Sequence, residues 1–504
     1  MPFPLPVPEL EPSTPEFETV PLIKPTGFRE YDGRWWFGRP GLDRKPEINL
    51  MGIQALGMGL GTLIRELGAG PRIVTGHDYR AYSASVKNAL TCGLMAAGAE
   101  VVDIGLSLSP MAYHAQFALD APSVAMVTAS HNPNGWTGVK MGCDRPVTFG
   151  PGEIARLREI VLGGHWQLCG GGSYEFVEGF RSEYISSLAQ RAPFSRKIRA
   201  VVACGNGTAG AFAPEVLSRL GVDVIEMDTR LDHSFPNHNP DPEDMRMLTA
   251  MAERVRETGA DIAFGFDGDG DRCGVVDNEG NEIFADIAGL LLARDIAATH
   301  PASHFVADIK STGLFATDPV LAQLGATVEY YRTGHSHMKR RIRETGAIAG
   351  FEKSGHFYLN HPVGHGYDDG IGAAIAICGL LERNPQKSMA EIRATVAATH
   401  ALPTMGVHCS DEKKYEAAGR VVDRFLAMQE AGEHFAGQEI SDCITVNGIR
   451  VVTEDGSWGL VRPSSNEPKL VVAIESPVSA TRRDEMFAAM DGLLRDVLGK
   501  VEYT

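Results

Sequence analysis

The sequence has few of the features that mark secreted, membrane-bound or zinc-ribbon proteins. No C-x-x-C pair occurs among its cysteines, so neither a zinc ribbon nor a disulfide framework is indicated. No apolar run approaches the roughly 20 residues of a membrane span, and prolines at positions 2, 4, 6 and 8 interrupt any apolar secretory core. The cytoplasm is the expected location. We expect reduced core thiols at Cys92, Cys143, Cys169, Cys204, Cys273, Cys378, Cys409 and Cys443.

Basic residues are fewer than acidic ones, with 47 Lys and Arg against 64 Asp and Glu, so the formal net charge is -17. Nucleic acid and anionic membranes both demand a basic surface, so neither is expected as a partner. The expected partners are small molecules, and an anionic one would need a local basic pocket. The chain itself is expected to be a monomer or a homodimer.

The length and composition are those of an ordinary enzyme with several domains. A chain of 504 residues exceeds what one core usually organises, so two to four domains are expected. The chain is 43% hydrophobic and 22% charged, which argues against a disordered or fibrous protein. The proline-rich first 26 residues favour an extended polyproline arm over a packed element.

Three segments repeat one plan, in which an apolar strand, a helix ending in small-Gly-small and a second apolar strand follow one another. Because a helix crosses between the strands, we expect parallel or mixed sheets covered on both faces. Each repeat has a first strand, a glycine turn and a second strand. The first repeat has these at 72–74, 97–99 and 101–104, the second at 200–202, 220–222 and 224–225, and the third at 305–307, 324–326 and 328–330.

The tail differs from these repeats, because helical apolar spacing surrounds strand-like runs at 444–446, 460–461 and 470–474. We therefore predict an α/β protein with three similar α/β domains of mixed sheets, plus a C-terminal α+β domain, around a central cleft. The expected parts are an arm at 1–26, α/β domains at 27–175, 176–281 and 282–396, and the last domain at 397–504.

A polar loop containing Ser130 and His131 follows the apolar strand at 124–127. Ser130 is expected to be exposed at the carboxyl end of that strand, where ligands bind in open α/β sheets. A serine hydroxyl needs a base or a metal to act as a nucleophile, and His131 could shape that environment. The alternative is a solvated Asn-Pro-Asn-Gly turn that Ser130 merely caps.

A second loop, after the apolar residues 262–264, alternates carboxylates with glycines at Asp267, Asp269 and Asp271. Glycine lets the backbone turn tightly enough to aim all three carboxylates at one point, where they repel unless a cation lies between them. The spacing does not fit an EF-hand, and Mg²⁺ suits phosphate chemistry better. The alternative is a charged hairpin turn.

Two further polar loops follow predicted strands. Glu352 and Ser354 can bind sugar hydroxyls, and His356 could exchange a proton near neutral pH. In the last domain Arg462 heads a loop whose guanidinium, hydroxyls and amide suit a phosphate dianion. Either loop could instead be a solvated connection, but each expected domain offers one polar loop at a strand end.

A competing pattern lies at 205–210, which matches G-x-G-x-x-G, follows a strand and has Glu226 about twenty residues further on. Read literally, it is the fingerprint of an NAD-dependent dehydrogenase. That interpretation leaves the aspartate loop and the Arg462 loop unexplained.

With these motifs assembled, residues 28 to 475 resemble the α-D-phosphohexomutase family, in particular its bacterial phosphomannomutases and phosphoglucomutases. The resemblance rests on 28–34, 128–133 with Lys140, 204–210, 235–238, 267–272 and the Arg462 loop. It implies a phosphoserine at Ser130, Mg²⁺ on the three aspartates, sugar recognition by Glu352 and Ser354, and phosphate docking by Arg462, Ser464, Ser465 and Asn466. Cleft cations and proton-transfer residues are implied at Arg34, Lys140, Arg272, His335 and His356, and Lys310 completes the expected substrate-binding set.

The resulting hypothesis is an intramolecular phosphotransferase that interconverts hexose 1-phosphate and hexose 6-phosphate of mannose, glucose or both. Phospho-Ser130 would give its phosphoryl group to the sugar, with a hexose 1,6-bisphosphate as intermediate and activator and with Mg²⁺ neutralising charge. Lys140 and His356 are the candidate general bases. A phosphoglucosamine mutase or a metal phosphatase remain alternatives, although Lys353 favours mannose and glucose over glucosamine.

Overall fold

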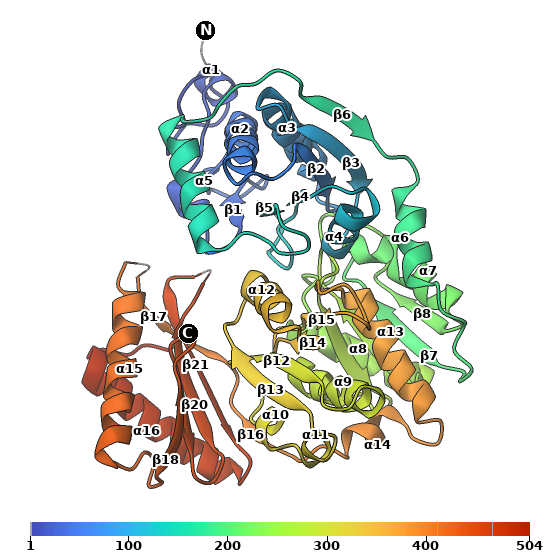
Figure 1. Cartoon of the computed structure of the whole chain (residues 1–504), viewed down its shortest axis with the longest axis vertical. Helices are drawn as coiled ribbons and strands as arrows, with labels where there is room; N and C mark the ends of the chain where they lie inside the picture. Colours follow the sequence, from blue (N-terminus) through green and yellow to red (C-terminus); the bar gives the residue numbers. More distant parts are fainter. Residues whose placement is uncertain (1–2, 411, 466, 504) are drawn as a thin grey trace. The chain divides into compact units, whose positions relative to one another are not determined.

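The structure, a computed structural model, describes residues 3–410, 412–465 and 467–503 (Figure 1). The chain divides into two compact units. The first consists of Met1–Phe284 with Ser354–Ala390, and the second of Ala285–Lys353 with Glu391–Thr504.

The first sheet of unit one has the strand order β1-β5-β4-β2-β3-β6. Strands β4, β2, β3 and β6 are parallel, whereas β5 runs antiparallel to β4 and β1. Its strands are β1 (Gly33–Trp36), β2 (Arg72–His77), β3 (Glu100–Leu106), β4 (Ser123–Val127), β5 (Trp136–Gly142) and β6 (Ser173–Phe176). Its helices are α2 (Leu50–Glu66), α3 (Ser83–Ala96), α4 (Ser109–Ala118) and α5 (Pro151–Gly163).

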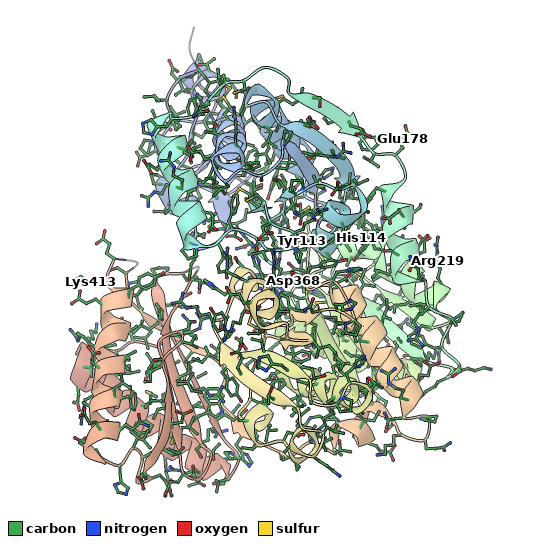
Figure 2. The ribbon with its side chains drawn as sticks, in the orientation of Figure 1. Tyr113, His114, Glu178, Arg219, Asp368 and Lys413 are labelled. Carbon is green, nitrogen blue, oxygen red and sulfur yellow. The ribbon has the colours of Figure 1, made fainter. Side chains whose placement is uncertain are left out.

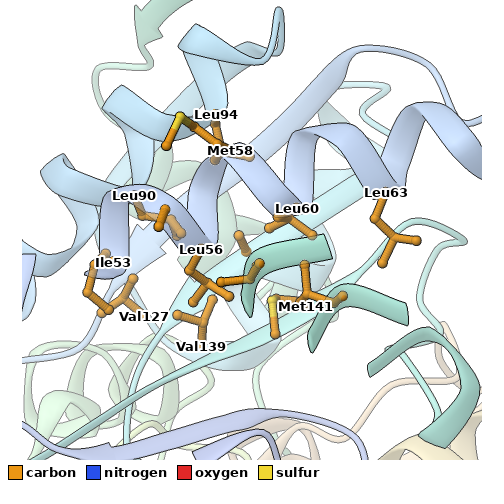
Figure 3. Packing of buried hydrophobic residues seen from close by; sticks show 14 of the residues in the cluster. Ile53, Leu56, Met58, Leu60, Leu63, Leu90, Leu94, Val127, Val139 and Met141 are labelled. Carbon is orange, nitrogen blue, oxygen red and sulfur yellow. The ribbon is translucent and has the colours of Figure 1, made fainter. Parts of the chain in front are cut away.

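Apolar packing fixes this sheet as the platform for the loops at its edge. Leucine, isoleucine and methionine side chains of α2 pack against α3 and against the strands, as Figure 3 shows for Leu56 and Leu60 beside Val139 and Met141. Helix α2 begins at Asn49, whose side chain accepts a hydrogen bond of 2.7 Å from the Gly52 amide.

The second sheet of unit one has the order β11-β10-β9-β7-β8, with β9, β7 and β8 parallel and β10 antiparallel to both of its neighbours. Its strands are β7 (Arg199–Ala203), β8 (Asp223–Met227), β9 (Ile262–Phe266), β10 (Cys273–Asp277) and β11 (Glu282–Ile283). The associated elements are α6 (Phe180–Leu188), a 3₁₀ turn (Thr208–Ala211), α7 (Ala213–Arg219), α8 (Met245–Thr258), β15 (Phe357–Leu359) and α13 (Gly370–Arg383).

Unit two contains parallel strands in the order β13-β12-β14, followed by an antiparallel sheet. The first part has α9 (Ala285–Thr299), β12 (His304–Asp308), α10 (Leu314–Thr317), α11 (Pro319–Gln323), β13 (Thr327–Tyr331), α12 (His335–Thr345) and β14 (Ala349–Phe351). The second has β16 (His400–Ala401), β17 (Met405–His408), α15 (Lys414–Ala431), β18 (Ile440–Ile444), β19 (Ile449–Thr453), β20 (Trp458–Pro463), β21 (Lys469–Ser476) and α16 (Ala480–Leu498). Helices α15 and α16 pack on the antiparallel sheet and on each other (Figure 1). Helix α14 spans Met389–Arg393.

The predicted fold class is confirmed. Each repeat found in the sequence is a pair of parallel strands joined through a helix: β2 with β3, β7 with β8, and β12 with β13. The tail combines an antiparallel sheet with two long helices, as expected for an α+β domain. Strands β16, β17 and β19 were not predicted, and β18 already ends at Ile444.

The expectation of an extended N-terminal arm is wrong, because part of this segment is helical and packed. Helix α1 (Pro15–Thr19) begins at Thr14, and proline suits the first turn of a helix. Leu22 and Ile23 are buried, and Ile23 joins the core beneath α2. Burial of these apolar side chains outweighs the polyproline preference of the surrounding residues.

The thiols are free, as expected, but not all of them lie in the core. Cys92 and Cys169 are exposed, whereas Cys204, Cys273 and Cys378 are buried. Across the ranges that the structure describes, no helix has both the length and the apolar character that crossing a membrane requires.

Candidate active site

Ser130 lies three residues beyond β4, at the carboxyl end of the first sheet of unit one. It is not exposed as expected but only 2% accessible, and its hydroxyl donates a hydrogen bond of 2.8 Å to Asp267 Oδ2. His131 Nδ1 is 3.4 Å from Ser130 Oγ. The Ser130 backbone has φ +50°, a left-handed conformation that costs a non-glycine residue roughly 1–2 kcal/mol. The surrounding contacts must therefore hold the loop in place.

Arg34 of β1 is one of these contacts. Its Nη1 donates to the Ala129 carbonyl at 2.7 Å and to Asn132 Oδ1 at 2.6 Å, while its Nε pairs with Asp32 at 2.9 Å. Burial opposes the charged guanidinium, but Asp32 and Asp269 outweigh it and raise the pKa of Arg34. Burial, Arg272 and Arg34 together lower the pKa of His131 well below its ordinary value, so His131 is neutral.

The loop between β9 and β10 brings three buried carboxylates together. One oxygen each from Asp267, Asp269 and Asp271 lies within 4.8 Å of the others. Gly270, at φ +74°, lets the loop turn between the last two. Burial and the charges of Asp269 and Asp271 raise the pKa of Asp267 well above its ordinary value, although Arg272 and Lys140 lower it.

The donor set of this loop fits a hard divalent cation. Among the described residues, Asp269 Oδ1 and Asp271 Oδ1 are buried and have no hydrogen-bond partner. Buried carboxylate oxygens without donors are costly unless a cation binds them, and Mg²⁺ prefers oxygen ligands. The structure therefore contains an aspartate-rich group able to hold a metal ion.

Lys140 of β5 lies against two of these aspartates. Its Nζ donates to Asp269 Oδ2 at 2.8 Å and also to Asp271 Oδ2. Burial opposes the charge on Lys140, but Asp269 and Asp271 outweigh it and raise the pKa of Lys140 well above its ordinary value. A lysine that keeps its proton cannot accept another, so this arrangement favours a cationic role for Lys140 over that of general base.

His356 lies beside the aspartate loop in unit one. Arg272 Nε donates to His356 Nε2 at 3.1 Å, and His356 Nδ1 lies 3.0 Å from Asp368 Oδ2 and 3.8 Å from Asp271 Oδ1. The oxygens of Asp271 and Asp368 and the ring of His356 also meet the geometric condition for holding a metal ion. The Asp368 carboxylate against Nδ1 orients the imidazole ring of His356.

Asp368 was not among the residues expected from the sequence. It lies just before α13, where an aspartate looks like a helix cap, and only the fold places it beside His356. Ser109, the first residue of α4, was also missed; its hydroxyl donates to Asp269 Oδ2 at 2.5 Å.

Asp368 and Tyr113, which lies on α4, are labelled in Figure 2. Burial raises the pKa of Tyr113 well above its ordinary value, so its hydroxyl stays protonated beside these charges.

Asp369, next to Asp368, makes stability depend on pH. Burial raises its pKa from 3.8 to about 6, although bonds from the Gly372 amide and the Tyr184 hydroxyl favour the charged form. A carboxyl whose pKa is higher in the folded protein stabilises it below about pH 4, and this contribution is lost as the pH rises to about 6.

We expect Asp369→Asn to remove this dependence, because an amide stays neutral and can still cap α13. As the pH rises from 4.5 to 7, the variant should gain about 2 kcal/mol of stability relative to the unsubstituted protein. Thermal unfolding of both proteins across this range measures the difference. A difference that does not change with pH would show that Asp369 is not protonated there.

In unit two, three predicted site residues follow the carboxyl ends of neighbouring parallel strands. The predicted substrate-binding residues Lys310 and Glu352 follow β12 and β14, and the predicted catalytic residue His335 follows β13. The Gly334 amide donates to the buried Glu352 carboxylate, and this bond joins the loop after β13 to the loop after β14. Ser354 is buried in unit one.

The antiparallel sheet of unit two holds the loop that carries Lys310. Buried Arg450 donates through Nη1 to the carbonyls on either side of Lys310, at 2.9 Å to Ile309 and 2.7 Å to Ser311. Buried Glu475 accepts from the two residues that follow, at 3.0 and 2.8 Å. Lys310 is therefore presented from a fixed backbone.

The Arg462 loop connects β20 to β21. Arg462 donates to the Pro463 carbonyl at 3.0 Å, and the Ser464 hydroxyl accepts from the Glu467 amide at 3.2 Å. Arg462 and Ser464 are buried and Ser465 is half-buried. Asn466 lies outside the described residues.

The glycine-rich turn at 205–210 is used for packing. A Cβ on Gly207 would lie 3.1 Å from the Gly268 Cα, and one on Gly210 would lie 2.0 Å from the Thr229 carbonyl. The Thr208 amide donates to the Gly268 carbonyl at 3.2 Å. Gly207 fits the turn closely against the aspartate loop and Gly210 fits it against Thr229. This packing role leaves the dehydrogenase interpretation without support.

A buried serine beside an aspartate trio, with cationic side chains around it on an α/β scaffold, defines a phosphoryl-transfer enzyme of the phosphohexomutase class. The chain matches the four domains described for phosphoglucomutase/phosphomannomutase: the α/β/α domains I at 28–166, II at 182–280 and III at 279–399, and the C-terminal domain at 407–493. It belongs to the phosphoglucomutase/phosphomannomutase family.

Similar proteins agree with this assignment. The phosphomannomutase/phosphoglucomutase of Pseudomonas putida is 32% identical over 92% of this chain and 94% of its own length. A phosphoglucomutase/phosphomannomutase family protein of Burkholderia thailandensis superposes with a TM-score of 0.84 at 27% identity, covering 96% of this chain and 100% of that one. The N-acetylphosphoglucosamine mutase of Aspergillus fumigatus, in complex with GlcNAc-6P and magnesium, shares the fold at 15% identity, with a TM-score of 0.52 and coverage of 86% and 80% of the two chains. The chain is a phosphohexomutase, as the sequence predicted.

Proposed function

We propose that this phosphohexomutase interconverts the 1- and 6-phosphates of mannose, glucose or both through a phosphoserine at Ser130. The observation that carries this proposal is the Ser130 hydroxyl, buried and 2.8 Å from Asp267 in a trio of carboxylates. Asp267, Asp269 and Asp271 would hold Mg²⁺ with the help of a Ser130 oxygen. When bound, Mg²⁺ supplies charge neutralisation for the transferring phosphoryl group.

The proposed reaction moves one phosphoryl group onto the sugar and another back. A free sugar hydroxyl attacks the phosphorus of phospho-Ser130; a new P–O bond forms, the bond to Ser130 Oγ breaks and the hydroxyl proton leaves to a base. The product is a hexose 1,6-bisphosphate. After it turns round, Ser130 Oγ takes the other phosphoryl group by the same steps in reverse.

Charged residues of unit one would support these steps. Arg34, Lys140 and Arg272 supply positive charge toward the phosphoryl oxygens, and Lys140 keeps its proton beside Asp269. His356, oriented by Asp368, is the candidate for carrying the hydroxyl proton, because its ring nitrogen Nδ1 faces a carboxylate. Neutral His131 and, from unit two, His335 are the further proton-transfer candidates.

Residues that would recognise the sugar phosphate come from both units. Glu352 and Ser354 would bind sugar hydroxyls, and Lys310 would add a cation. The phosphate that does not react would dock at Arg462, Ser464, Ser465 and Asn466, where one guanidinium and short polar side chains follow one another. The same proposal places the enzyme in the cytoplasm, as a monomer or a homodimer.

A direct assay tests the proposal. Purified protein is given mannose, glucose or glucosamine 1-phosphate with Mg²⁺ and catalytic hexose 1,6-bisphosphate, and hexose 6-phosphate and inorganic phosphate are both measured. We expect 6-phosphate from mannose or glucose and little free phosphate. Preferred turnover of glucosamine 1-phosphate would indicate the phosphoglucosamine mutase alternative, and stoichiometric phosphate release would indicate a phosphatase. Intact mass before and after bisphosphate reports the phosphoserine.

A further inference from the structure

Arg80, in the turn between β2 and α3, has no part in the reaction described above, yet it donates three hydrogen bonds to the Ser130 loop. It is buried, and its Nη2 donates to the Ser130 and Asn132 carbonyls, each at 2.8 Å. Its Nη1 donates to the Pro133 carbonyl at 3.1 Å. One guanidinium therefore holds three carbonyls of the loop in which Ser130 adopts its left-handed conformation.

The guanidinium is itself held from the other side. Arg80 Nε donates to Asp78 Oδ2 at 3.1 Å, and that carboxylate also accepts from the Thr128 hydroxyl at 2.9 Å. The Ser83 hydroxyl donates to Asp78 Oδ1 at 2.5 Å. Asp78 therefore fixes Arg80 and, through Thr128, the strand end that leads into the loop.

The Ser130 carbonyl is confined on a second side by the aspartate loop. A Cβ on Gly268 would lie 2.5 Å from this carbonyl oxygen, so the two backbones meet where a larger residue would not fit. The peptide after Ser130 therefore has little freedom to rotate. Because the side chain leaves from the same Cα, fixing this peptide also fixes the direction of the Cα–Cβ bond, from which Oγ reaches Asp267.

We propose that Arg80 is a positioning residue for phosphoryl transfer, which sets the Ser130 backbone so that the oxygen carrying the phosphoryl group faces the aspartate trio. This inference rests on the proposed role of Ser130. It requires arginine, because a planar guanidinium offers five fixed N–H donors, four of which are used here, whereas a lysine ammonium is a single point charge.

The test compares Arg80→Met with Arg80→Lys in the full-length enzyme. Steady-state kinetics on glucose and mannose 1-phosphates with catalytic bisphosphate should show a kcat lower by roughly 10- to 100-fold, the usual cost of losing a residue that orients a metal-site group. KM for the hexose phosphate should be unchanged, because Arg80 has no proposed contact with it. The Mg²⁺ concentration for half-maximal rate should rise, and Arg80→Lys should recover little of the loss.

Arg196→Met is the matched control, because Arg196 also donates to three backbone carbonyls, at 2.8 to 2.9 Å, but in a turn at the end of α13. It should lower the melting temperature and leave kcat and the Mg²⁺ requirement unchanged. A wild-type kcat per folded molecule in Arg80→Met, or an equal loss in Arg196→Met, overturns the proposal. If Arg80→Met does not fold, Arg80→Lys decides by the same criteria. Full activity of a Ser130→Ala variant would instead reject the proposed function, so the two failures are distinguishable.

Discussion

Replacing Ser130 with alanine should abolish the interconversion of hexose 1- and 6-phosphates, with kcat falling by about 10⁴-fold or more, as loss of a covalent nucleophile commonly does. Alanine removes the oxygen that donates to Asp267 at 2.8 Å and that we propose to carry the phosphoryl group. No other hydroxyl of the described 128–135 loop takes its place, because the Thr128 hydroxyl is bonded to Asp78. A coupled assay for hexose 6-phosphate measures the loss, and intact mass should show no phosphorylation after incubation with bisphosphate.

Ser123→Ala is the matched control for this substitution. Ser123 begins the same strand, β4, and is also buried, and its Oγ has no hydrogen-bond partner among the described residues. Its replacement should leave kcat and phosphorylation unchanged. Unaltered turnover in Ser130→Ala, with circular dichroism showing a folded protein, would reject Ser130 as the phosphoryl carrier.

Much of the fold could be predicted from the sequence because its signals are local. Apolar runs separated by a helix with a terminal glycine specify parallel strand pairs, and such pairs place polar loops at one edge of a sheet. The loops of Ser130 and of the aspartate trio were located in this way. Their meeting could not be derived from strand patterns, since the two bonded side chains are 137 residues apart in sequence. The family resemblance alone implied it.

Other features depend on contacts that leave no local trace. Asp368 looks like a helix cap, and nothing in its neighbourhood points to His356, twelve residues earlier. Ser130 was expected to be exposed, but the aspartate loop covers it. The sequence around β4 gives no sign of that contact. Arg80 did carry a usable signal, since Asp78 and Arg80 follow a strand end just as the predicted functional loops do.

The second large effect is expected at Asp269. Its Oδ2 accepts from Lys140 at 2.8 Å and from Ser109 at 2.5 Å, whereas its Oδ1 has no hydrogen-bond partner among the described residues. In Asp269→Asn the amide oxygen can keep the first two bonds, which places the NH₂ group where Oδ1 was. A donor then replaces a proposed ligand, and one negative charge is lost from the trio.

We therefore expect Asp269→Asn to raise the Mg²⁺ concentration needed for half-maximal rate and to lower kcat at saturating Mg²⁺ by about 10²-fold or more. Activity measured against Mg²⁺ concentration gives both quantities. The control is Asp277→Asn, a buried aspartate at the end of β10 whose carboxylate accepts from the Glu279 and Asn281 amides of its own turn. It should change the melting temperature but not the Mg²⁺ dependence, because its carboxylate takes no part in the trio. If Asp269→Asn kept the original Mg²⁺ dependence, the carboxylate trio would not be the metal site.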